Sequence, residues 1–256
     1  MIGLAPRQLR QAAGRTARLL PYWSKVAARA PLDQQVMALH RRVLPREFWI
    51  ELASITLAGD VREWRLPHHG FAIDGDWDLG QIGPRPSILE PAHDGTVKSM
   101  THATIRAMFI EGVPYQATPQ YEVMIEAVER KDAQRAYGCE SVEEVDEYFQ
   151  RLLSAHRGMS ADGFRTQREL GLPPWDEVKV YITRDGRLCH GNGGNHRIRI
   201  AELLGVKSIP VIFAGAHRDW LVGLCQQQDR PPRSALRQWV GAQERTGSLH
   251  RSRPSH

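Results

Sequence analysis

Cysteine is scarce in this chain, since only Cys139, Cys189 and Cys225 occur in 256 residues. Their spacing fits neither a zinc-binding pattern nor a disulfide framework, which excludes a cysteine-held metal site and a disulfide-stapled secreted domain. We interpret each as a small buried hydrophobic residue and expect a cytoplasmic location. A run of about 18 apolar residues is also missing, so the sequence predicts no transmembrane helix.

Acidic residues are absent from positions 1–30, which carry six Lys and Arg residues. Residues 229–256 are similar, with six Arg against Asp229 and Glu244. The net charge of +5 therefore belongs to the two ends, because residues 31–228 hold 22 basic and 27 acidic residues. Such a body lacks the positive charge that sequence-independent nucleic-acid binding needs, so any nucleic-acid contact would come from the basic ends.

Composition divides the chain into three parts. We expect a basic N-terminal arm at residues 1–35, one central domain at 36–228 and a basic, disordered tail at 229–256. The arm is compatible with a basic amphipathic helix or with a solvated segment, and its lack of acidic residues is also typical of transit peptides.

Helical periodicity dominates the middle of the central domain, at about residues 99–168. Ser141 with Glu144 three residues later has the pattern of a helix capping box. Before this helical middle, residues 48–50 and 71–73 are strand candidates.

The stretch 178–213 predicts strand, hairpin, strand, glycine-rich loop, helix and strand, in that order. Residues 178–182 alternate apolar and polar positions and are rich in β-branched side chains. Asp185-Gly186 is a strong two-residue hairpin signal, and three glycines follow at 191–194. We therefore expect an α+β fold, with a small mixed sheet and a helical insert.

A glycine-rich loop that opens a helix can hold a phosphate. The first amides of a helix have no partner inside it, and the helix dipole makes that end positive. Gly193 and Gly194 would let the backbone approach the anion, and Arg197 would bind two phosphate oxygens. Asn195 would cap the helix, and His196 would donate or shuttle a proton. The alternative is a tight strand-to-helix turn with a capping Asn195 and a surface Arg197.

The run Gly194-Asn195-His196-Arg197, with residues 200–205 and Ile-Pro-Val at 209–211, resembles the core of the ParB/sulfiredoxin-like superfamily. Members share a strand, a Gly-x-x-Arg loop that opens a helix, and an Ile-Pro-Val strand. The resemblance implies a nucleoside triphosphate or another phosphorylated ligand at this loop. Partition proteins bind CTP there, sulfiredoxins use ATP, and a free-serine kinase branch uses a phosphate donor.

Two departures narrow what the resemblance implies. Asn195 stands where sulfiredoxins carry their catalytic Cys, which excludes thiol-based repair. Only about 36 residues follow Trp220, in place of the DNA-binding domain of partition proteins, so we expect no chromosome-partition role. Residues 75–78 and 217–220 also resemble a group of uncharacterised ParB-like proteins from prokaryotes and phages.

Asp76 and Asp78 form a second candidate site, apart from the glycine-rich loop. Carboxylates at i and i+2 of an extended segment point to one side, so this pair would hold Mg²⁺ beside a phosphate, or one would act as a base. The candidate catalytic residues are therefore Asp76, Asp78 and His196. His217 and Arg218 would face the same cleft and bind the phosphate. The alternatives are a solvated acidic turn for the aspartates and an ordinary surface pair for His217-Arg218.

These observations favour a protein that binds a nucleotide or another phosphorylated small molecule, with Mg²⁺-dependent NTP hydrolysis or phosphoryl transfer as the implied reaction. One alternative is a nucleic-acid-binding protein or nuclease that uses the basic ends. The other is a non-catalytic interaction module that keeps only the fold.

Overall fold

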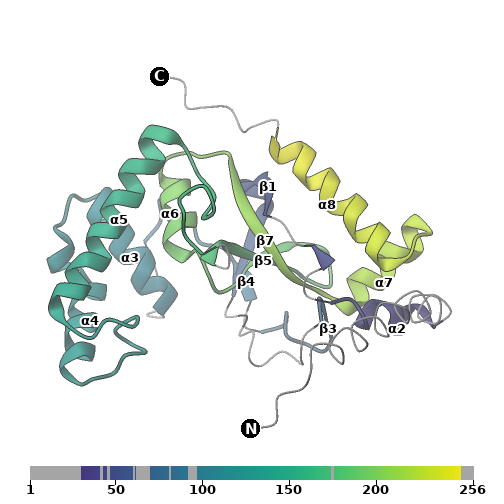
Figure 1. The fold of residues 1–256 in the computed structure, drawn as a ribbon, viewed down its shortest axis with the longest axis horizontal. Coiled ribbons are helices and arrows are strands. Elements are labelled where there is room, and N and C mark those ends of the chain that lie inside the picture. The colour runs from purple at the N-terminus through teal and green to yellow at the C-terminus, as the bar shows by residue number, and fades with distance from the viewer. Residues whose placement is uncertain are drawn as a thin grey trace, which may run out of the picture.

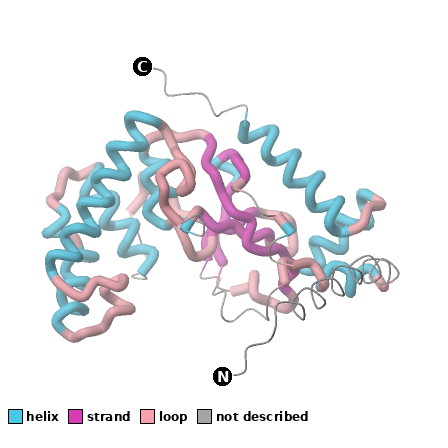
Figure 2. The backbone as a smooth tube through the Cα atoms, in the orientation of Figure 1, coloured by secondary structure: helices cyan, strands magenta, loops and turns pink. Residues whose placement is uncertain are grey.

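The computed structural model of the chain describes residues 30–40, 43, 44, 47–59, 61, 70–80, 82–91, 97–173 and 176–248. Within these ranges, seven α-helices and a seven-stranded mixed sheet make an α+β fold, as predicted. The sheet lies at the centre with helices to either side (Figure 1), and strands and helices are distinguished by colour in Figure 2. Most of the basic arm, residues 1–29, lies outside the described residues, so its role stays a prediction.

The sheet has the strand order β1-β7-β5-β6-β2-β4, and β3 pairs with β7 beside that path. The strands are β1 (Phe48–Glu51), β2 (Ile55–Gly59), β3 (Ala72–Ile73), β4 (Ile82–Pro84), β5 (Val178–Ile182), β6 (Leu188–His190) and β7 (Ser208–His217). β5 is a central strand, parallel to β7 and antiparallel to β6. Both of its faces are covered near its end, because the consecutive residues Val180, Tyr181 and Ile182 are all buried although their side chains point to alternate faces.

The helices form two groups. They are α2 (Leu32–Met37), α3 (Val97–Phe109), α4 (Pro119–Glu129), α5 (Val142–Asp162), α6 (Asn195–Leu203), α7 (Arg218–Gln228) and α8 (Pro232–Ser248), with short 3-10 turns at Leu52–Ser54 and Tyr115–Ala117. In Figure 1, α3 to α6 lie on one side of the sheet, and α2, α7 and α8 lie on the other.

The predicted helical middle is confirmed by α3, α4 and α5. These helices share a small core of their own, centred on Met124, Val145 and Phe149. The capping box at Ser141 is half formed: the Ser141 hydroxyl accepts from the Glu144 amide at 3.3 Å, whereas the Glu144 carboxylate accepts from the amide of Glu140.

The predicted order of elements in residues 178–213 is also confirmed. The helix of this stretch, α6, begins at Asn195, directly after the glycine-rich loop. The last strand runs further than the apolar pattern indicated, to His217.

The expectation of a disordered tail from residue 229 is wrong for residues 232–248, which form α8. Ala235, Leu236 and Val240 are buried in the main core, and Trp239 packs edge-on against Trp220 at 4.9 Å. These positions recur with helical spacing, and this apolar stripe outweighs the Pro- and Arg-rich composition on which the expectation rested.

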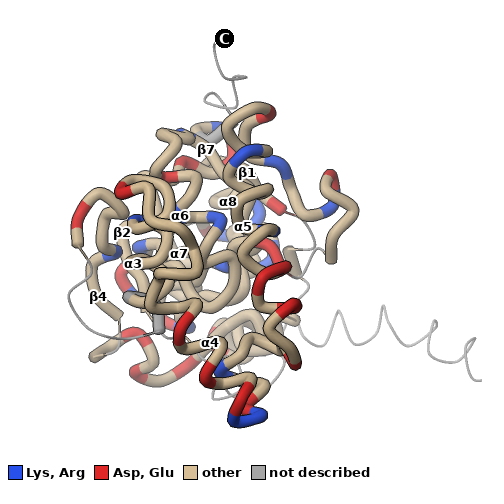
Figure 3. The backbone as a smooth tube through the Cα atoms, turned by 90° about the vertical axis from the view of Figure 1, so that its left-hand side faces the viewer, with Lys and Arg blue, Asp and Glu red and all other residues tan. Residues whose placement is uncertain are grey.

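Charges of both signs are interspersed over the helical side of the molecule, as Figure 3 shows. This distribution agrees with the near balance of acidic and basic residues in the central part of the sequence. Among the described helices, none combines the length and the apolar content that crossing a bilayer requires.

Candidate functional site

The glycine-rich loop between β6 and α6 lies directly against β5. Gly194 has φ +67°, and a Cβ there would lie 2.7 Å from Cγ2 of Val178. A Cβ on Gly191 would lie 2.3 Å from the ring of Tyr181. The glycines are therefore required by the close approach of the loop to the strand, whatever else the loop binds.

Hydrogen bonds fix the loop while leaving the helix start open. Nε2 of His190 donates to the Gly193 carbonyl at 2.8 Å. Gly194 occupies the N-cap position without a side-chain hydrogen bond, so the prediction that Asn195 caps the helix is wrong. The first amide with an intrahelical acceptor is that of Ile198, which donates to Gly194 at 3.0 Å. The amides of residues 195–197 therefore have no acceptor inside α6.

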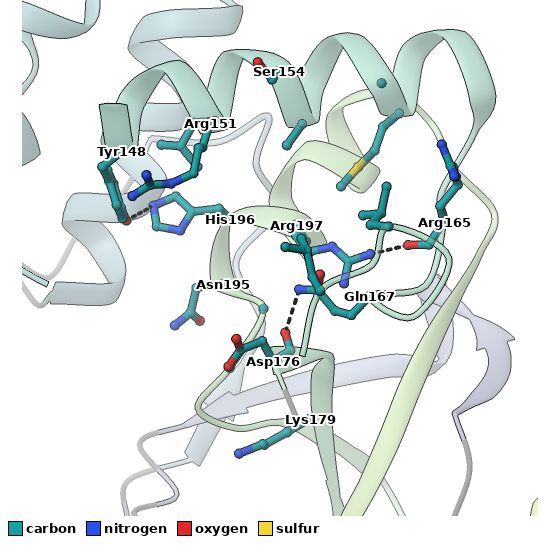
Figure 4. A pocket seen from close by; sticks show the side chains of 18 of the residues that line it. Tyr148, Arg151, Ser154, Arg165, Gln167, Asp176, Lys179, Asn195, His196 and Arg197 are labelled. Atoms are coloured by element: carbon teal, nitrogen blue, oxygen red, sulfur yellow. Dashed lines mark hydrogen bonds between the residues drawn. The ribbon is translucent and has the colours of Figure 1, made fainter. Parts of the chain in front are cut away.

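A cavity of about 810 Å³ lies over this helix start. Its walls are the loop residues 192–197, the face of α5 between Tyr148 and Asp162, and the segment leading into β5 (Figure 4). The charged residues of its lining are Arg151, Asp162, Arg165, Asp176, Lys179 and Arg197. All five predicted loop residues, 193–197, thus line one cavity.

Arg197 is held by protein groups. Its guanidinium donates to the Glu177 carboxylate at 2.5 Å and to the Arg165 carbonyl, and it stacks over the ring of Phe164 at 4.4 Å. The exposed fractions of the Arg197 and Glu177 side chains are 11% and 0%. Burial lowers the pKa of Arg197 and raises that of Glu177, and their attraction opposes both shifts. The alternative of a surface Arg197 is therefore wrong. Its guanidinium lines the cavity but is bonded to protein groups, so it stabilises the loop, and a contact with phosphate stays a prediction.

His196 sits between the loop and the helical middle. Its Nε2 lies 3.1 Å from the Tyr148 hydroxyl and 3.5 Å from Oε1 of Gln120 (Figure 4 shows the Tyr148 contact). Burial, with the nearby charge of Arg199, lowers the pKa of His196 to about 4. His196 is thus a neutral imidazole at neutral pH and can donate a hydrogen bond there without carrying a charge.

Asp76 and Asp78 come together as predicted, but around Arg184. Asp78 accepts from the Arg184 amide at 2.8 Å and from Nε of Arg184 at 2.9 Å, and Asp76 accepts from Nη2 of Arg184 at 2.8 Å. Burial alone would raise the pKa of Asp78, but these bonds from Arg184 lower it. The guanidinium occupies the place of a cation, so these residues do not fit a Mg²⁺ site. Within the described ranges, no group of three or more His, Cys, Asp or Glu could hold a metal ion.

His217 and Arg218 join this acidic turn. Nδ1 of His217 accepts from the Asp219 amide at 3.1 Å and so caps α7, while its Nε2 donates to the Gly75 carbonyl at 2.9 Å. Arg218 pairs with Asp74 at 3.1 Å. His217 and Arg218 thus lie near the aspartates, as predicted. Their contacts with Gly75 and Asp74 join the start of α7 to the turn after β3.

The glycine-rich loop and the acidic turn at residues 74–78 are separated by the length of β5. The loop packs on Val178 at one end of the strand, and the acidic turn binds Arg184 just beyond the other end. At roughly 3.3 Å per residue, these ends are about 20 Å apart. The candidate site is therefore the cavity alone, without Asp76, Asp78, His217 or Arg218.

Several residues of the cavity were missed by sequence reasoning. Tyr148, Arg151, Ala155 and Met159 share one face of α5, and none of them was named as a candidate although their helical spacing is visible in the sequence. Lys179 is the polar position in the alternating pattern of β5 and could have been placed beside the loop.

Comparison with known proteins gives no relative that would identify the site: no family model, no curated protein and no solved structure matches the chain.

Proposed function

We propose that the cavity binds a nucleotide or another phosphorylated small molecule, with a phosphoryl group at the start of α6. The observation that carries this proposal is the set of three amides, at residues 195–197, that lack an intrahelical acceptor and line a cavity. Amides at a helix start attract anions because they donate hydrogen bonds and stand at the positive end of the dipole. This ligand class is the one that the ParB/sulfiredoxin-like resemblance implies. We also propose a cytoplasmic location.

The charges around the cavity suit an anion. Arg151 and Arg165 pair only loosely with acidic neighbours, at 3.8 Å to Glu147 and 3.7 Å to Asp162. These side chains are all at least 45% exposed, so the pairs contribute little and can exchange for a ligand phosphate. Lys179 adds a third basic side chain on the side of β5 (Figure 4).

The rest of the lining suits the apolar part of such a ligand. Tyr137, Leu170 and Leu172 line the cavity while 41%, 44% and 51% exposed, so they offer apolar surface that a ligand could cover. The volume of about 810 Å³ lies within the range of small-molecule sites. A base or a similar flat group would cover these side chains.

Turnover is a separate matter from binding. Asp76 and Asp78 are too far from the loop to serve a phosphate there. Asp176, an exposed carboxylate, lines the cavity near Asn195 and Lys179, and is the acidic group placed to assist hydrolysis or transfer (Figure 4). We therefore propose ligand binding as the function and Asp176 as the residue to examine if nucleotide is consumed.

One observation favours the interaction-module alternative. Arg197 supports the fold through Glu177, so the Gly-x-x-Arg pattern has a structural explanation that needs no ligand. The two accounts differ in a single outcome, which is whether any phosphorylated compound binds at the cavity.

The experiment is a thermal-shift and calorimetry series with inorganic phosphate and with nucleoside mono-, di- and triphosphates, each with and without Mg²⁺. A ligand at 100 times its Kd stabilises the folded state by about 2.7 kcal/mol, which raises Tm by about 5–10 °C for a chain of this size. Lys179→Met should weaken binding about tenfold or more, because it removes a charged partner of the phosphate. Lys207→Met is the matched control, since Lys207 is exposed at the edge of β7 and does not line the cavity. Unchanged melting with every compound would leave the interaction module as the better account.

A further inference from the structure

We propose that Gln120 and Tyr148 hold His196 in a single neutral tautomer, with its proton on Nδ1, so that the imidazole donates a hydrogen bond into the cavity. The part of this proposal that concerns ligand recognition rests on the proposed function. The part that concerns the tautomer of His196 does not depend on it. Tyr148 and Gln120 are then positioning residues for His196.

The three side chains form a chain of hydrogen bonds. Nε2 of Gln120 donates to the Tyr148 hydroxyl at 3.1 Å, and that hydroxyl lies 3.1 Å from Nε2 of His196. The two rings meet edge-on, with centroids 5.6 Å apart. Gln120 is fully buried, so its amide has a fixed environment.

The orientation of the Gln120 amide sets the direction of the chain. Its Nε2 lies 4.0 Å from the sulfur of Met124, a weak acceptor that suits an amino group rather than a carbonyl oxygen. The Tyr148 oxygen therefore accepts from Gln120, and its own proton needs another acceptor. We assign that acceptor to Nε2 of His196, at 3.1 Å, which is then the unprotonated ring nitrogen. Oε1 of Gln120 would accept only from a protonated Nε2, and it lies further from that nitrogen, at 3.5 Å.

The proton of the neutral ring consequently resides on Nδ1. Within the described part of the chain, Nδ1 of His196 has no hydrogen-bond partner, and His196 lines the cavity. The ring also stays neutral, because burial and the charge of Arg199 lower its pKa to about 4. Tyr148, which bonds the ring, and Arg151 line the cavity with it. Nδ1–H is thus a donor at neutral pH, beside the amides at the start of α6.

This arrangement specifies what the cavity recognises. Nδ1–H and the three backbone amides are all donors, so the bound group must be rich in acceptor oxygens, as a phosphoryl group is. A neutral donor adds direction without the desolvation cost of a buried charge. The loss of this donor should weaken binding of inorganic phosphate and of ATP about 2- to 10-fold.

The test is long-range ¹H–¹⁵N NMR of the full chain labelled at histidine nitrogens, in which protonated and unprotonated ring nitrogens are resolved. We expect His196 of the wild type to carry its proton on Nδ1. Tyr148→Phe should move it to Nε2, where Oε1 of Gln120 can accept it, and should weaken phosphate binding. Tyr121→Phe is the matched control, because Tyr121 packs on Phe149 in the same helical middle at 5.5 Å and donates to Asp146, and it neither lines the cavity nor bonds His196.

The outcomes separate this inference from the proposed function. A wild-type His196 protonated on Nε2 overturns the inference even if phosphate binds. An Nδ1 proton that Tyr148→Phe fails to move also overturns it, since Tyr148 then does not set the tautomer. An Nδ1 proton lost in Tyr148→Phe, together with no binding of phosphate or ATP by the wild type, supports the positioning role and contradicts the proposed function.

Discussion

The Arg197 guanidinium donates to the Glu177 carboxylate at 2.5 Å, behind the loop in which the sequence pattern placed a phosphate-binding arginine. The same carboxylate accepts from the amides of Gln167 at 2.9 Å and Val178 at 3.3 Å. The pair therefore joins α6, the start of β5 and the segment before it. Anion binding at the loop then depends on backbone amides, and Arg197 contributes by holding them in place.

Arg197→Ala should lower the free energy of unfolding by about 3–5 kcal/mol, because it leaves Glu177 buried without its counter-charge. Urea denaturation followed by circular dichroism measures this. The double variant Arg197→Met with Glu177→Gln should recover much of the loss, since no uncompensated charge remains. If Arg197→Ala is as stable as the wild type, Arg197 has no structural role and is again a candidate for binding the phosphate.

Asp78→Asn should cost about 1.5–3 kcal/mol of stability, because it removes a charged acceptor for both the amide and the guanidinium of Arg184. Asp76→Asn is the matched control: its side chain is 78% exposed, against 2% for Asp78, and it should change stability by less than about 0.5 kcal/mol. Chemical denaturation gives both values. Equal effects of the two variants would contradict the unequal roles given to the two carboxylates. A Mg²⁺-dependent Tm that either variant abolishes would show that the pair is a metal site.

His102 and His196 should make the fold less stable as the pH falls from about 6.5 to 4. Nδ1 of His102 accepts from Arg199 at 3.0 Å and its Nε2 donates to the Glu90 carbonyl, so it is neutral, and burial lowers its pKa. The pKa of His196 is lowered to about 4. In the unfolded chain each would take up a proton near pH 6.5, so the unfolded state binds more protons and stability falls through this window.

The contribution of His196 is up to about 3 kcal/mol at the acid end. Denaturation at stepped pH values, with NMR titration of the histidine ring protons, checks both parts. Titration of His196 near pH 6.5, the value of an unstructured peptide, would contradict a ring that stays neutral at neutral pH.

Leu236→Ala should lower the free energy of unfolding by about 2–5 kcal/mol, because Leu236 is fully buried where α8 packs on the core. Arg237→Ala, one residue further on the exposed face of the same helix, should change it by less than about 0.5 kcal/mol. Thermal and urea denaturation of both variants compare them directly. If Leu236→Ala behaves like Arg237→Ala, α8 is not part of the folded core.

Local patterns were the part of this structure that the sequence predicted well. Alternation in 178–182, the Asp185-Gly186 turn and the glycines at 191–194 depend on backbone preferences of neighbouring residues, and the elements formed in the expected order. The tail was misjudged because its overall composition was given more weight than the spacing of Leu236 and Val240.

The partners of charged side chains could not be predicted in the same way. Asp78 meets Arg184 across 106 positions of the chain, and Arg197 meets Glu177 only because the loop folds back onto β5. Such pairings depend on strand order, which no local pattern contains. For the same reason, the sequence could not predict that Asp76 lies a strand's length away from the loop.

The measurement that tests the central claim most directly is a ¹H–¹⁵N NMR titration of the full chain with ATP and with inorganic phosphate. If a phosphoryl group binds at the start of α6, the amide resonances of Asn195, His196 and Arg197 should shift in a saturable way, because those amides gain an acceptor, and the shifts should weaken in Lys179→Met. Saturable binding that leaves these three amides unmoved, or no binding at millimolar ligand, would contradict the account.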